Sequence, residues 1–336
     1  MVRELVAPEQ YMSRALELAI SADLARDTNP IVGAVIVDDA GNVVGEGFHN
    51  GSGSAHAEVA AIAQAGEKAK GATLYCTLEP CNAQGKTGPC AQAIIKAGIS
   101  KVIIAQRDPN AAMAGGAQTL IDAGIAVEFD VMADQARELN ASWNFAHENN
   151  RPWVIWKTAT SLDGFIGAAD GTSQWITGEP ARERVQEIRA SVGAIVTGSG
   201  TVLTDDPLLT VRSLSEMDQP LRVIVGDREI PESAKIFAGL KPAIRIKGDL
   251  DKVIKALWEV HGIHKVLVEA GAAIAHSLWT ADLVDEVYWF QAPVLIGAGT
   301  PAIGPFGVNT LANAPRFPQY QLDRVGLDLL IHFKTR

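Results

Sequence analysis

The chain contains little cysteine and no long apolar run. Three cysteines in 336 residues cannot build a disulfide framework, and such sparse use is typical of a reducing compartment. No stretch of about 18 consecutive apolar residues occurs, so a membrane-spanning helix is not expected. The first residues, Met1 to Glu4, lack the basic and apolar regions of a signal peptide. We therefore expect a cytoplasmic protein with no membrane partner.

The chain is also short of positive charge. It carries 29 lysines and arginines against 39 aspartates and glutamates, which gives a formal net charge of −10. Because a protein needs a basic surface to bind a phosphate backbone, this balance disfavours nucleic acid and leaves a small molecule as the expected substrate. Composition does not determine the oligomeric state, and a homo-oligomer is left open.

Length and composition favour two domains. The chain is too long for one typical domain, and its apolar share of 47% is enough for two buried cores. A polar break, Asn-Asn-Arg-Pro at 149–152, precedes the first strand-like run of the second half. We therefore expect one domain over residues 1–148 and another over residues 152–336.

Both halves show the alternating strands and helices of an α/β fold. Apolar residues at helical spacing predict helices, and short β-branched runs between turn residues predict strands. In the first half, helices are expected over 9–25, 55–69 and 90–96, and strands over 31–37, 43–48, 72–77 and 101–105. In the second half, strands are expected over 153–158, 194–197, 221–225, 265–269, 286–290 and 327–333, and helices over 179–191, 250–260 and 273–281. The strand–helix–strand order predicts parallel strands, with ligands at their carboxyl ends.

One histidine and two cysteines in the first half have the ligand types of a zinc site. His56 stands two residues before Glu58, Cys81 follows Glu-Pro, and Cys90 opens the next expected helix. Three protein ligands leave the fourth tetrahedral position of zinc open for water, which is typical of a catalytic site. Zinc lowers the pKa of that water from about 15.7 toward about 7, and Glu58 can carry its proton. This combination is the signature of zinc-dependent base deaminases.

The cysteine spacing departs from that signature. Two residues separate the cysteines in generic base deaminases, whereas residues 82–89 separate Cys81 from Cys90 here. Ordinary buried thiols are the alternative interpretation. Cys76 lies in an apolar strand-like run and is expected in the core. His49, taken alone, is typical of a surface residue at the end of a hairpin.

The second half lacks the G-x-G-x-x-G turn of a Rossmann dinucleotide site. It has glycine-rich turns at 197–201, 269–272 and 297–300, each expected to follow a strand. Such turns can hold phosphate through backbone N–H groups, although each one alone is more often structural. Arg212, near Asp205, can grip a phosphate bidentately. Trp175, between hydroxyl residues, either covers a planar ring or lies in the core.

The ordered motifs of both halves resemble those of the bacterial bifunctional riboflavin-biosynthesis deaminase/reductase family over nearly the whole chain. The first half carries Asn-Pro-x-Val-Gly at 29–33, Gly-Glu-Gly-x-His at 45–49, His-Ala-Glu-Val at 56–59, Thr-Leu-Glu-Pro-Cys at 77–81 and Gly-Lys-Thr-x-Pro-Cys at 85–90. The second half carries Ser-Leu-Asp-Gly at 161–164, Ser-Gln-Trp-Ile-Thr at 173–177, Asp-Asp-Pro-x-Leu-Thr-Val-Arg at 205–212 and Val-Glu-Ala-Gly at 268–271. The long gap between the cysteines is the gap that this family has.

The resemblance implies a fold, two cofactors and two reactions. An N-terminal cytidine-deaminase-like α/β/α domain would use Zn²⁺ to remove the 2-amino group of 2,5-diamino-6-(5-phosphoribosylamino)pyrimidin-4-one. A C-terminal dihydrofolate-reductase-like α/β domain would use NADPH to reduce the ribosyl group of 5-amino-6-(5-phosphoribosylamino)uracil to ribityl. The substrates would thus be small phosphorylated pyrimidines.

The resemblance also implies roles for individual residues. The zinc ligands would be His56, Cys81 and Cys90, and Glu58 would be the catalytic proton carrier. The deaminase substrate would be held by Asn29, His49 and Lys86. The reductase substrate would be held by Lys157, Ser173, Arg189, Leu209, Arg212 and Glu269. NADPH would be held by Ala159, Trp175, Thr201, Asp205 and Gly271.

Departures from the family and rival interpretations stay open. Asn-Ala-Gln at 82–84 replaces a common Ser-His-His, Asp-Thr at 27–28 lacks a frequent proline, and Gly-Asp-Arg at 226–228 replaces Asp-Ser, so an NADPH contact there is not assumed. One rival is a cytidine or guanine deaminase fused to an unrelated domain. Another is a structural zinc protein, whose closed site would need Cys76 or His49 as a fourth ligand. A third keeps the fold but has lost one activity.

Overall fold

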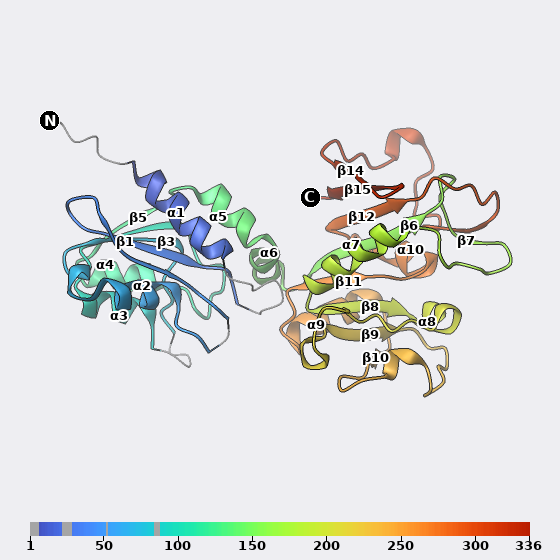
Figure 1. Cartoon of the computed structure of the whole chain (residues 1–336), viewed down its shortest axis with the longest axis horizontal. Helices are drawn as coiled ribbons and strands as arrows, with labels where there is room; N and C mark the ends of the chain where they lie inside the picture. Colours follow the sequence, from blue (N-terminus) through green and yellow to red (C-terminus); the bar gives the residue numbers. More distant parts are fainter. Residues whose placement is uncertain (1–6, 22–28, 52, 84–87) are drawn as a thin grey trace. The chain divides into compact units, whose positions relative to one another are not determined.

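The chain folds into two compact units, Met1–Asn149 and Asn150–Arg336, each with its own β-sheet (Figure 1). The computed structural model describes residues 7–21, 29–51, 53–83 and 88–336. The boundary between the units falls in the polar break at 149–152. Among the described residues, no helix combines the length and the apolar character needed to cross a membrane.

The first unit contains a five-stranded sheet of order β2-β1-β3-β4-β5. The strands are β1 Gly33–Val37, β2 Val43–Phe48, β3 Thr73–Leu78, β4 Lys101–Gln106 and β5 Ala126–Phe129. Strand β1 pairs antiparallel with both β2 and β3, while β3, β4 and β5 run parallel. Strands β2 and β3 therefore point the same way on either side of β1. The parallel strands predicted from the strand–helix–strand order are confirmed for β2, β3 and β4.

Helices cover both faces of this sheet, so the unit is a three-layer α/β/α sandwich (Figure 1). The helices are α1 Pro8–Ile20, α2 Ala57–Ala65, α3 Cys90–Ala97, α4 Gly116–Asp122, α5 Ala133–Leu139 and α6 Ala141–Asn149. Ala34 and Ile36 of β1 pack in one core with α2, α3 and α4. Val35 and Val37 pack in the other core with α1 and α5. This alternation is the period of two of a strand buried on both faces, and the predicted α/β/α fold is confirmed.

Helix α2 lies unusually close to strand β2. A Cβ atom added to Gly47 would lie 2.3 Å from the carbonyl oxygen of Ala57, and one added to Gly45 would lie 2.3 Å from that of Ala61. Two glycines facing alanines thus bring the start of the helix against the sheet. The helix begins at Ala57 rather than at the expected residue 55, so His56 is its N-cap residue and only Glu58 lies in the first turn. A short 3₁₀ helix, Gly66–Ala69, completes the segment predicted as one helix.

The second unit contains an eight-stranded sheet of order β10-β9-β8-β11-β6-β12-β15-β14. The strands are β6 Trp153–Thr160, β8 Ala194–Gly198, β9 Leu221–Val225, β10 Ile244–Ile246, β11 Lys265–Val268, β12 Glu286–Gln291, β14 Gln321–Val325 and β15 Asp328–Lys334. The strands from β10 to β12 are parallel, and β15 and β14 are antiparallel additions at one edge. The α/β fold predicted for this half is confirmed.

Helices α7 Glu179–Ala190, α8 Ser199–Asp205, α9 Leu250–Glu259 and α10 Ala272–Thr280 connect these strands. Three 3₁₀ helices, Glu216–Asp218, Lys235–Phe237 and Leu311–Asn313, lie in the loops. The buried faces of α9 and α10 pack with alternate sheet residues such as Val154, Val196 and Val268 in one core. Because parallel strands share one carboxyl edge, the residues after β8, β9 and β11 open toward the same side of the sheet.

A second, two-stranded sheet explains one glycine-rich turn. Strand β7 Phe165–Ala168 pairs with β13 Gly299–Pro301. A Cβ atom on Gly299 would lie 1.9 Å from the carbonyl oxygen of Gly167, so this glycine permits close strand pairing. The turn at 297–300 follows β12, which ends at Gln291, but its last residues form β13 rather than leading into a helix.

Candidate functional site

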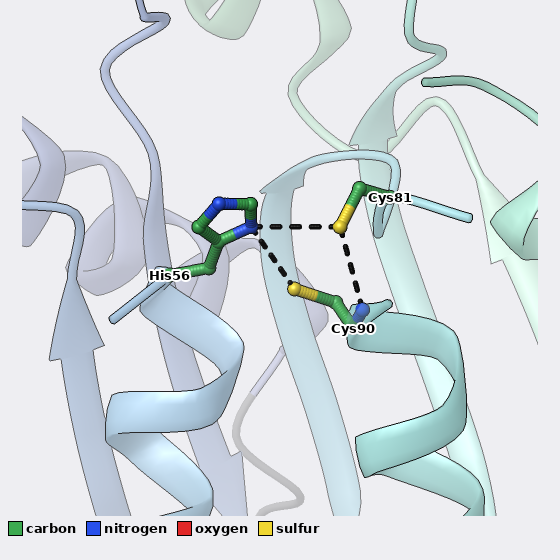
Figure 2. Close-up of side chains that lie close together, drawn as sticks. All are labelled: His56, Cys81 and Cys90. Atoms are coloured by element: carbon green, nitrogen blue, oxygen red, sulfur yellow. Dashed lines mark hydrogen bonds between the residues drawn. The ribbon is translucent and has the colours of Figure 1, made fainter. Parts of the chain in front are cut away.

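His56, Cys81 and Cys90 point toward one another in the first unit (Figure 2). The Nδ1 atom of His56 lies 3.2 Å from the Sγ atom of Cys90 and 3.5 Å from that of Cys81. All three candidate ligand atoms lie within 4.8 Å of one another. The three side chains thus form one compact N/S₂ donor set.

The spacing of these atoms matches tetrahedral zinc. Ligand bonds of about 2.0 Å to nitrogen and about 2.3 Å to sulfur at a tetrahedral angle separate the two ligand atoms by about 3.5 Å. The measured N···S distances of 3.2 and 3.5 Å are close to that value. One imidazole and two thiols are also the ligand types that zinc prefers over hard cations. The residues present therefore fit a zinc ion with one open coordination position.

Three different elements carry the donor set. His56 caps α2, Cys90 is the first residue of α3, and Cys81 lies in the loop after β3. The backbone N–H of Cys90 donates to the Sγ atom of Cys81 at 3.3 Å, as expected where a helix start offers free N–H groups to a thiolate. Each ligand thus belongs to a packed element or is tied to one.

A buried carboxylate anchors the loop that carries Cys81. Glu79 is 7% exposed and accepts hydrogen bonds from the backbone N–H groups of Asp108, Gly115 and Ala117. A Cβ atom on Gly116 would lie 1.8 Å from the carbonyl oxygen of Pro80, so only glycine lets the start of α4 approach this loop. The loop position therefore depends on residues about 35 positions away in sequence, which no local pattern predicts.

The electrostatics of the donor set favour metal binding and proton transfer. Hydrogen bonds from Cys90 and then His56 lower the pKa of the Cys81 thiol, which favours the thiolate, the form that binds a metal. Glu58 is 3% exposed, and burial raises the pKa of its carboxyl group above the usual value. A carboxyl group with a raised pKa holds a proton more readily, as a group that transfers protons requires.

The structure places the other residues considered for the first site in different environments. His49 is 5% exposed, with its ring 5.2 Å from the ring of His56, so the surface interpretation of His49 is wrong. Asn29 is half-buried just before β1. Lys86 lies outside the described residues. Cys76 is fully buried in β3 and donates to the carbonyl oxygen of Ile103, as expected for a core residue. Within the described ranges, neither His49 nor Cys76 joins the three clustered donors.

Asp108 is a residue of this region that the sequence patterns did not single out. It follows β4, at the carboxyl edge where ligands gather. Burial, together with the nearby acidic groups of Glu79, Cys81 and Glu58, raises the pKa of Asp108 to about 7. The signal available in the sequence is its place directly after a buried parallel strand, in Arg-Asp-Pro-Asn at 107–110.

In the second unit, one cavity of about 1080 Å³ collects all the residues expected there. The walls come from β6, α7, α8 and the loops after β7, α8, β9 and β11. The expected residues on these walls are Lys157, Ala159, Ser173, Trp175, Arg189, Thr201, Asp205, Leu209, Arg212, Glu269 and Gly271. The volume of this cavity is at the upper end of the usual 300–1,000 Å³ of a small-molecule site, as a site for large ligands requires.

The walls of this cavity are basic although the chain is acidic. Among the lining residues, six are lysine or arginine and three are aspartate or glutamate. Glycines 198, 200 and 271 line the same cavity, and a Cβ atom added to Gly200 would lie 3.6 Å from a terminal nitrogen of Arg228. An excess of cations next to open backbone fits phosphorylated ligands, including the phosphates of a nicotinamide dinucleotide.

A buried ion cluster lies at one end of the cavity. Glu269, after β11, is 8% exposed and accepts hydrogen bonds from Arg189 at 2.5 and 3.1 Å. The Nζ atom of Lys157 lies 2.9 Å from the same carboxylate. Burial alone would raise the pKa of Glu269, but Arg189 and Lys157 outweigh it and hold the pKa at about 2. The carboxylate is therefore ionised and fixes both cations at the cavity wall.

Trp175 stands at the opening of the cavity rather than in the core. Its side chain is 68% exposed, and the guanidinium of Arg182 lies 4.8 Å from the ring centroid. The core interpretation of Trp175 is therefore wrong. Next to it, the hydroxyl of Ser173 donates to Asp205 at 2.5 Å, which ties this loop to α8. An exposed indole supported on one side by a cation can stack on a planar ring.

Two family models match the chain, one in each unit. The cytidine and deoxycytidylate deaminase zinc-binding region matches residues 6–106. The RibD C-terminal domain matches residues 152–330. The zinc-binding match contains His56, Glu58, Cys81 and Cys90, and the second match contains every wall residue named above.

Curated relatives match over nearly the full length of both chains. The riboflavin biosynthesis protein RibD of Aquifex aeolicus is 37% identical, with 99% of this chain and 99% of the relative covered. The protein of the same name from Escherichia coli is 39% identical, with 96% and 98% covered.

Solved structures agree with the sequence relatives. Acinetobacter baumannii RibD, in its form 2, is 37% identical and superposes with a TM-score of 0.88 over 97% of this chain and 98% of that one. A Thermotoga maritima structure named as a diaminohydroxyphosphoribosylaminopyrimidine deaminase/5-amino-6-(5-phosphoribosylamino)uracil reductase is 31% identical, with a TM-score of 0.82 over 97% and 98%. Full-length coverage at this identity, together with a family model in each unit, shows that the chain belongs to the riboflavin biosynthesis protein RibD family.

Proposed function

We propose that this chain catalyses two consecutive reactions of riboflavin biosynthesis, one in each unit. The first deaminates 2,5-diamino-6-(5-phosphoribosylamino)pyrimidin-4-one, and the second reduces the ribosyl group of 5-amino-6-(5-phosphoribosylamino)uracil. The observation that carries the proposal is the coexistence, in one chain, of the three-donor metal set beside Glu58 and the basic cavity around Glu269. We assign the deaminase to residues 1–148 and the reductase to residues 152–336.

In the deaminase, the chain's own residues hold the metal and move protons. His56, Cys81 and Cys90 would hold a zinc ion, which would supply a water acidic enough to react at neutral pH. Glu58 lies beside Cys90, and its carboxylate would take up a proton at this site and would deliver one to the departing nitrogen. Burial of Glu58 keeps the proton away from bulk solvent during the exchange.

The remaining residues of this unit orient the pyrimidine. His49 lies edge-on to His56 with the ring centroids 5.2 Å apart, which supports its role in holding the pyrimidine. Asp108, whose pKa is raised chiefly by burial, would donate as well as accept at the heterocycle in its protonated form. Asn29 and Lys86 complete the substrate set in this proposal, as the family resemblance implies.

In the reductase, NADPH supplies the hydride, and the protein positions the two reactants. Trp175, Thr201, Asp205, Ala159 and Gly271 hold the cofactor in this assignment. They occupy walls from α8, β6 and the loops after β7 and β11, all facing the same cavity.

The reductase substrate is held by the basic end of that cavity. Arg212 is exposed on the wall and binds the phosphate. Lys157, Arg189 and Glu269 form the fixed ion cluster against which the ribose lies. Ser173 and Leu209 complete this substrate set.

The same proposal places the chain in the cytoplasm, acting on small phosphorylated pyrimidines. A reducing compartment keeps Cys81 and Cys90 free of disulfides and available to the metal, and all three cysteines are free thiols here. Two subunits or more per assembly would be compatible with either site.

The test is an incubation of the purified chain with the diaminopyrimidine phosphate, with and without NADPH. We expect ammonia release without NADPH, and NADPH oxidation only after deamination has begun. Arg212→Ala should raise the reductase KM strongly while ammonia release stays nearly unchanged.

A deaminase fused to an unrelated domain makes a different prediction in the same assay. It would release ammonia from cytidine or guanine rather than from the phosphorylated diaminopyrimidine. NADPH would then not be consumed, and both halves of the proposal would have to be withdrawn.

A further inference from the structure

The segment from Asp205 to Arg212 forms one wall of the reductase cavity but has little regular structure of its own. Helix α8 ends at Asp205, and seven of these eight residues line the cavity. Asp206 and Leu209 adopt positive φ angles of 40° and 50°, a region that residues other than glycine rarely occupy. Such a backbone persists only where the surrounding structure holds it.

Arg222 of β9 holds this segment from inside the unit. Its side chain is 2% exposed and donates to the carbonyl oxygens of Leu208 at 3.2 Å, of Ala238 at 3.0 Å and of Lys241. Burial alone accounts for the lowered pKa of its guanidinium, and no carboxylate contributes to that shift. A buried cation is costly unless its donors are paired. Main-chain carbonyls accept from both terminal nitrogens of Arg222, while its buried Nε atom has no hydrogen-bond partner among the described residues. The planar guanidinium thus joins the wall segment to the loop at 238–241.

Gln219 holds the same segment three residues further along. Its Oε1 atom accepts from the backbone N–H of Val211 at 2.7 Å, and its Nε2 atom donates to the carbonyl oxygen of Val211 at 2.9 Å. The same Nε2 atom lies 3.1 Å from the carbonyl oxygen of Leu214. Arg222 and Gln219 therefore fix the main chain on both sides of Leu209.

Neither residue is part of the cavity wall. Arg222 and Gln219 are absent from the residues that line the cavity, whereas the segment between their attachment points lines it almost continuously. Any effect of these two side chains on a ligand must pass through the position of Leu209 and Arg212.

We propose that Arg222 and Gln219 are positioning residues of the reductase site. They set the backbone of 208–211 so that Leu209 and Arg212 meet the phosphorylated substrate. This proposal rests on the reductase function proposed above. It differs from a purely structural role because it requires a change in substrate KM, not only in the amount of folded enzyme.

The test compares Arg222→Met, Arg222→Lys and Gln219→Ala with wild type in the full-length chain. Arg222→Met removes the bonds to both loops at similar volume, and we expect the KM for the phosphoribosylaminouracil to rise about tenfold or more, because small misplacements of binding groups cost this much. The kcat per folded enzyme and the KM for NADPH should change less than about threefold. Arg222→Lys keeps the charge, but a lysine can reach only one of the two loops. Its KM for the phosphoribosylaminouracil should therefore lie between the values of the wild type and of Arg222→Met.

Internal and matched controls accompany these variants. Ammonia release by the other unit should be unchanged in every variant, since its site lies in a separate core. Arg324→Met removes an exposed arginine of the same unit that donates to one carbonyl, that of Gly326, and should leave the reductase KM unchanged. If Arg222→Met does not fold, Gln219→Ala decides, with an expected KM rise of about threefold or more.

The outcomes separate this inference from the proposed function. A wild-type chain that does not oxidise NADPH would refute the reductase function itself. With an active wild type, an unchanged substrate KM in Arg222→Lys and Gln219→Ala would overturn the positioning role. A fall in kcat that merely follows the folded fraction, with KM constant, would overturn it as well.

Discussion

Replacing Glu269 by glutamine should destabilise the second unit and leave the first unit unaffected. The carboxylate lies between Arg189 and Lys157, whose side chains are only 15% and 16% exposed. Its pKa of about 2 means that it is fully ionised at neutral pH. Glutamine keeps the shape but removes the charge, so two partly buried cations lose their counter-ion. Breaking one partner of such a buried cluster costs about 3–5 kcal/mol.

The loss should be visible in urea unfolding followed by tryptophan fluorescence. Every tryptophan except Trp143 belongs to the second unit, so the signal reports mainly on that unit. With an m-value of about 2 kcal/mol/M for a unit of this size, the midpoint should fall by about 2 M. Glu259→Gln, which removes an exposed partner of Lys255 on α9, is the matched control and should shift the midpoint by less than about 0.3 M.

Two results would refute the reasoning. One is an equal midpoint for Glu269→Gln and the Glu259→Gln control, because the cluster would then carry no net stabilisation. The other is a parallel loss of ammonia release, because the destabilisation would then not be confined to the second unit.

Three further predictions follow from the remaining charged groups. Glu58→Gln should keep about one zinc per chain by elemental analysis, while ammonia release falls at least a hundredfold (~10²–10⁴ for a general acid–base group). Deamination at the wild-type rate in this variant would show that Glu58 is not the proton carrier. Cys90→Ala should abolish zinc retention and ammonia release, yet NADPH oxidation with the deaminated substrate supplied directly should persist. Burial alone would raise the pKa of Glu286. The hydrogen bond from His332 and the charge of Lys265 outweigh burial and lower this pKa from 4.5 to about 2. Its contribution of about 3 kcal/mol is therefore present above about pH 4.5 and is lost as the pH falls toward 2, so the urea midpoint of Glu286→Gln should depend less on pH in that window than the wild-type midpoint.

The metal set could be predicted from the sequence because its chemistry is carried by residue type. Imidazole and thiol ligands with a nearby carboxylate are rare in combination, and strand and helix periodicity placed each of them near an element end. The long gap between the cysteines did not prevent the prediction of the metal set. Cys81 lies in the loop after β3, and Cys90 is the first residue of α3, which packs on the same face of the sheet as α2. The role of His56 as an N-cap rather than a first-turn residue was missed because helix boundaries depend on how closely α2 approaches Gly45 and Gly47.

The elements missed in the sequence are those that tertiary contacts define. Helices α4 and α5 have only seven residues each, which is too short for a clear apolar period. Strand β14 is exposed along nearly its whole length and exists because it pairs with β15. Likewise, Trp175 is a large apolar residue in an exposed position, and its exposure could not be read from its identity.

The positive charge of the second site is a functional feature that likewise could not be predicted from the sequence. The net charge of −10 describes the whole chain, yet basic residues outnumber acidic ones on the cavity walls. These cations come from segments as far apart in sequence as Lys157 and Lys235, so no local cluster of basic residues in the sequence predicts the basic cavity. A bulk acidic balance therefore disfavours an extended basic surface for nucleic acid, but it does not argue against a concave site for small phosphorylated ligands. The fold produces that site by collecting scattered cations at one carboxyl edge, where Glu269 fixes two of them and leaves Arg212 exposed to the cavity.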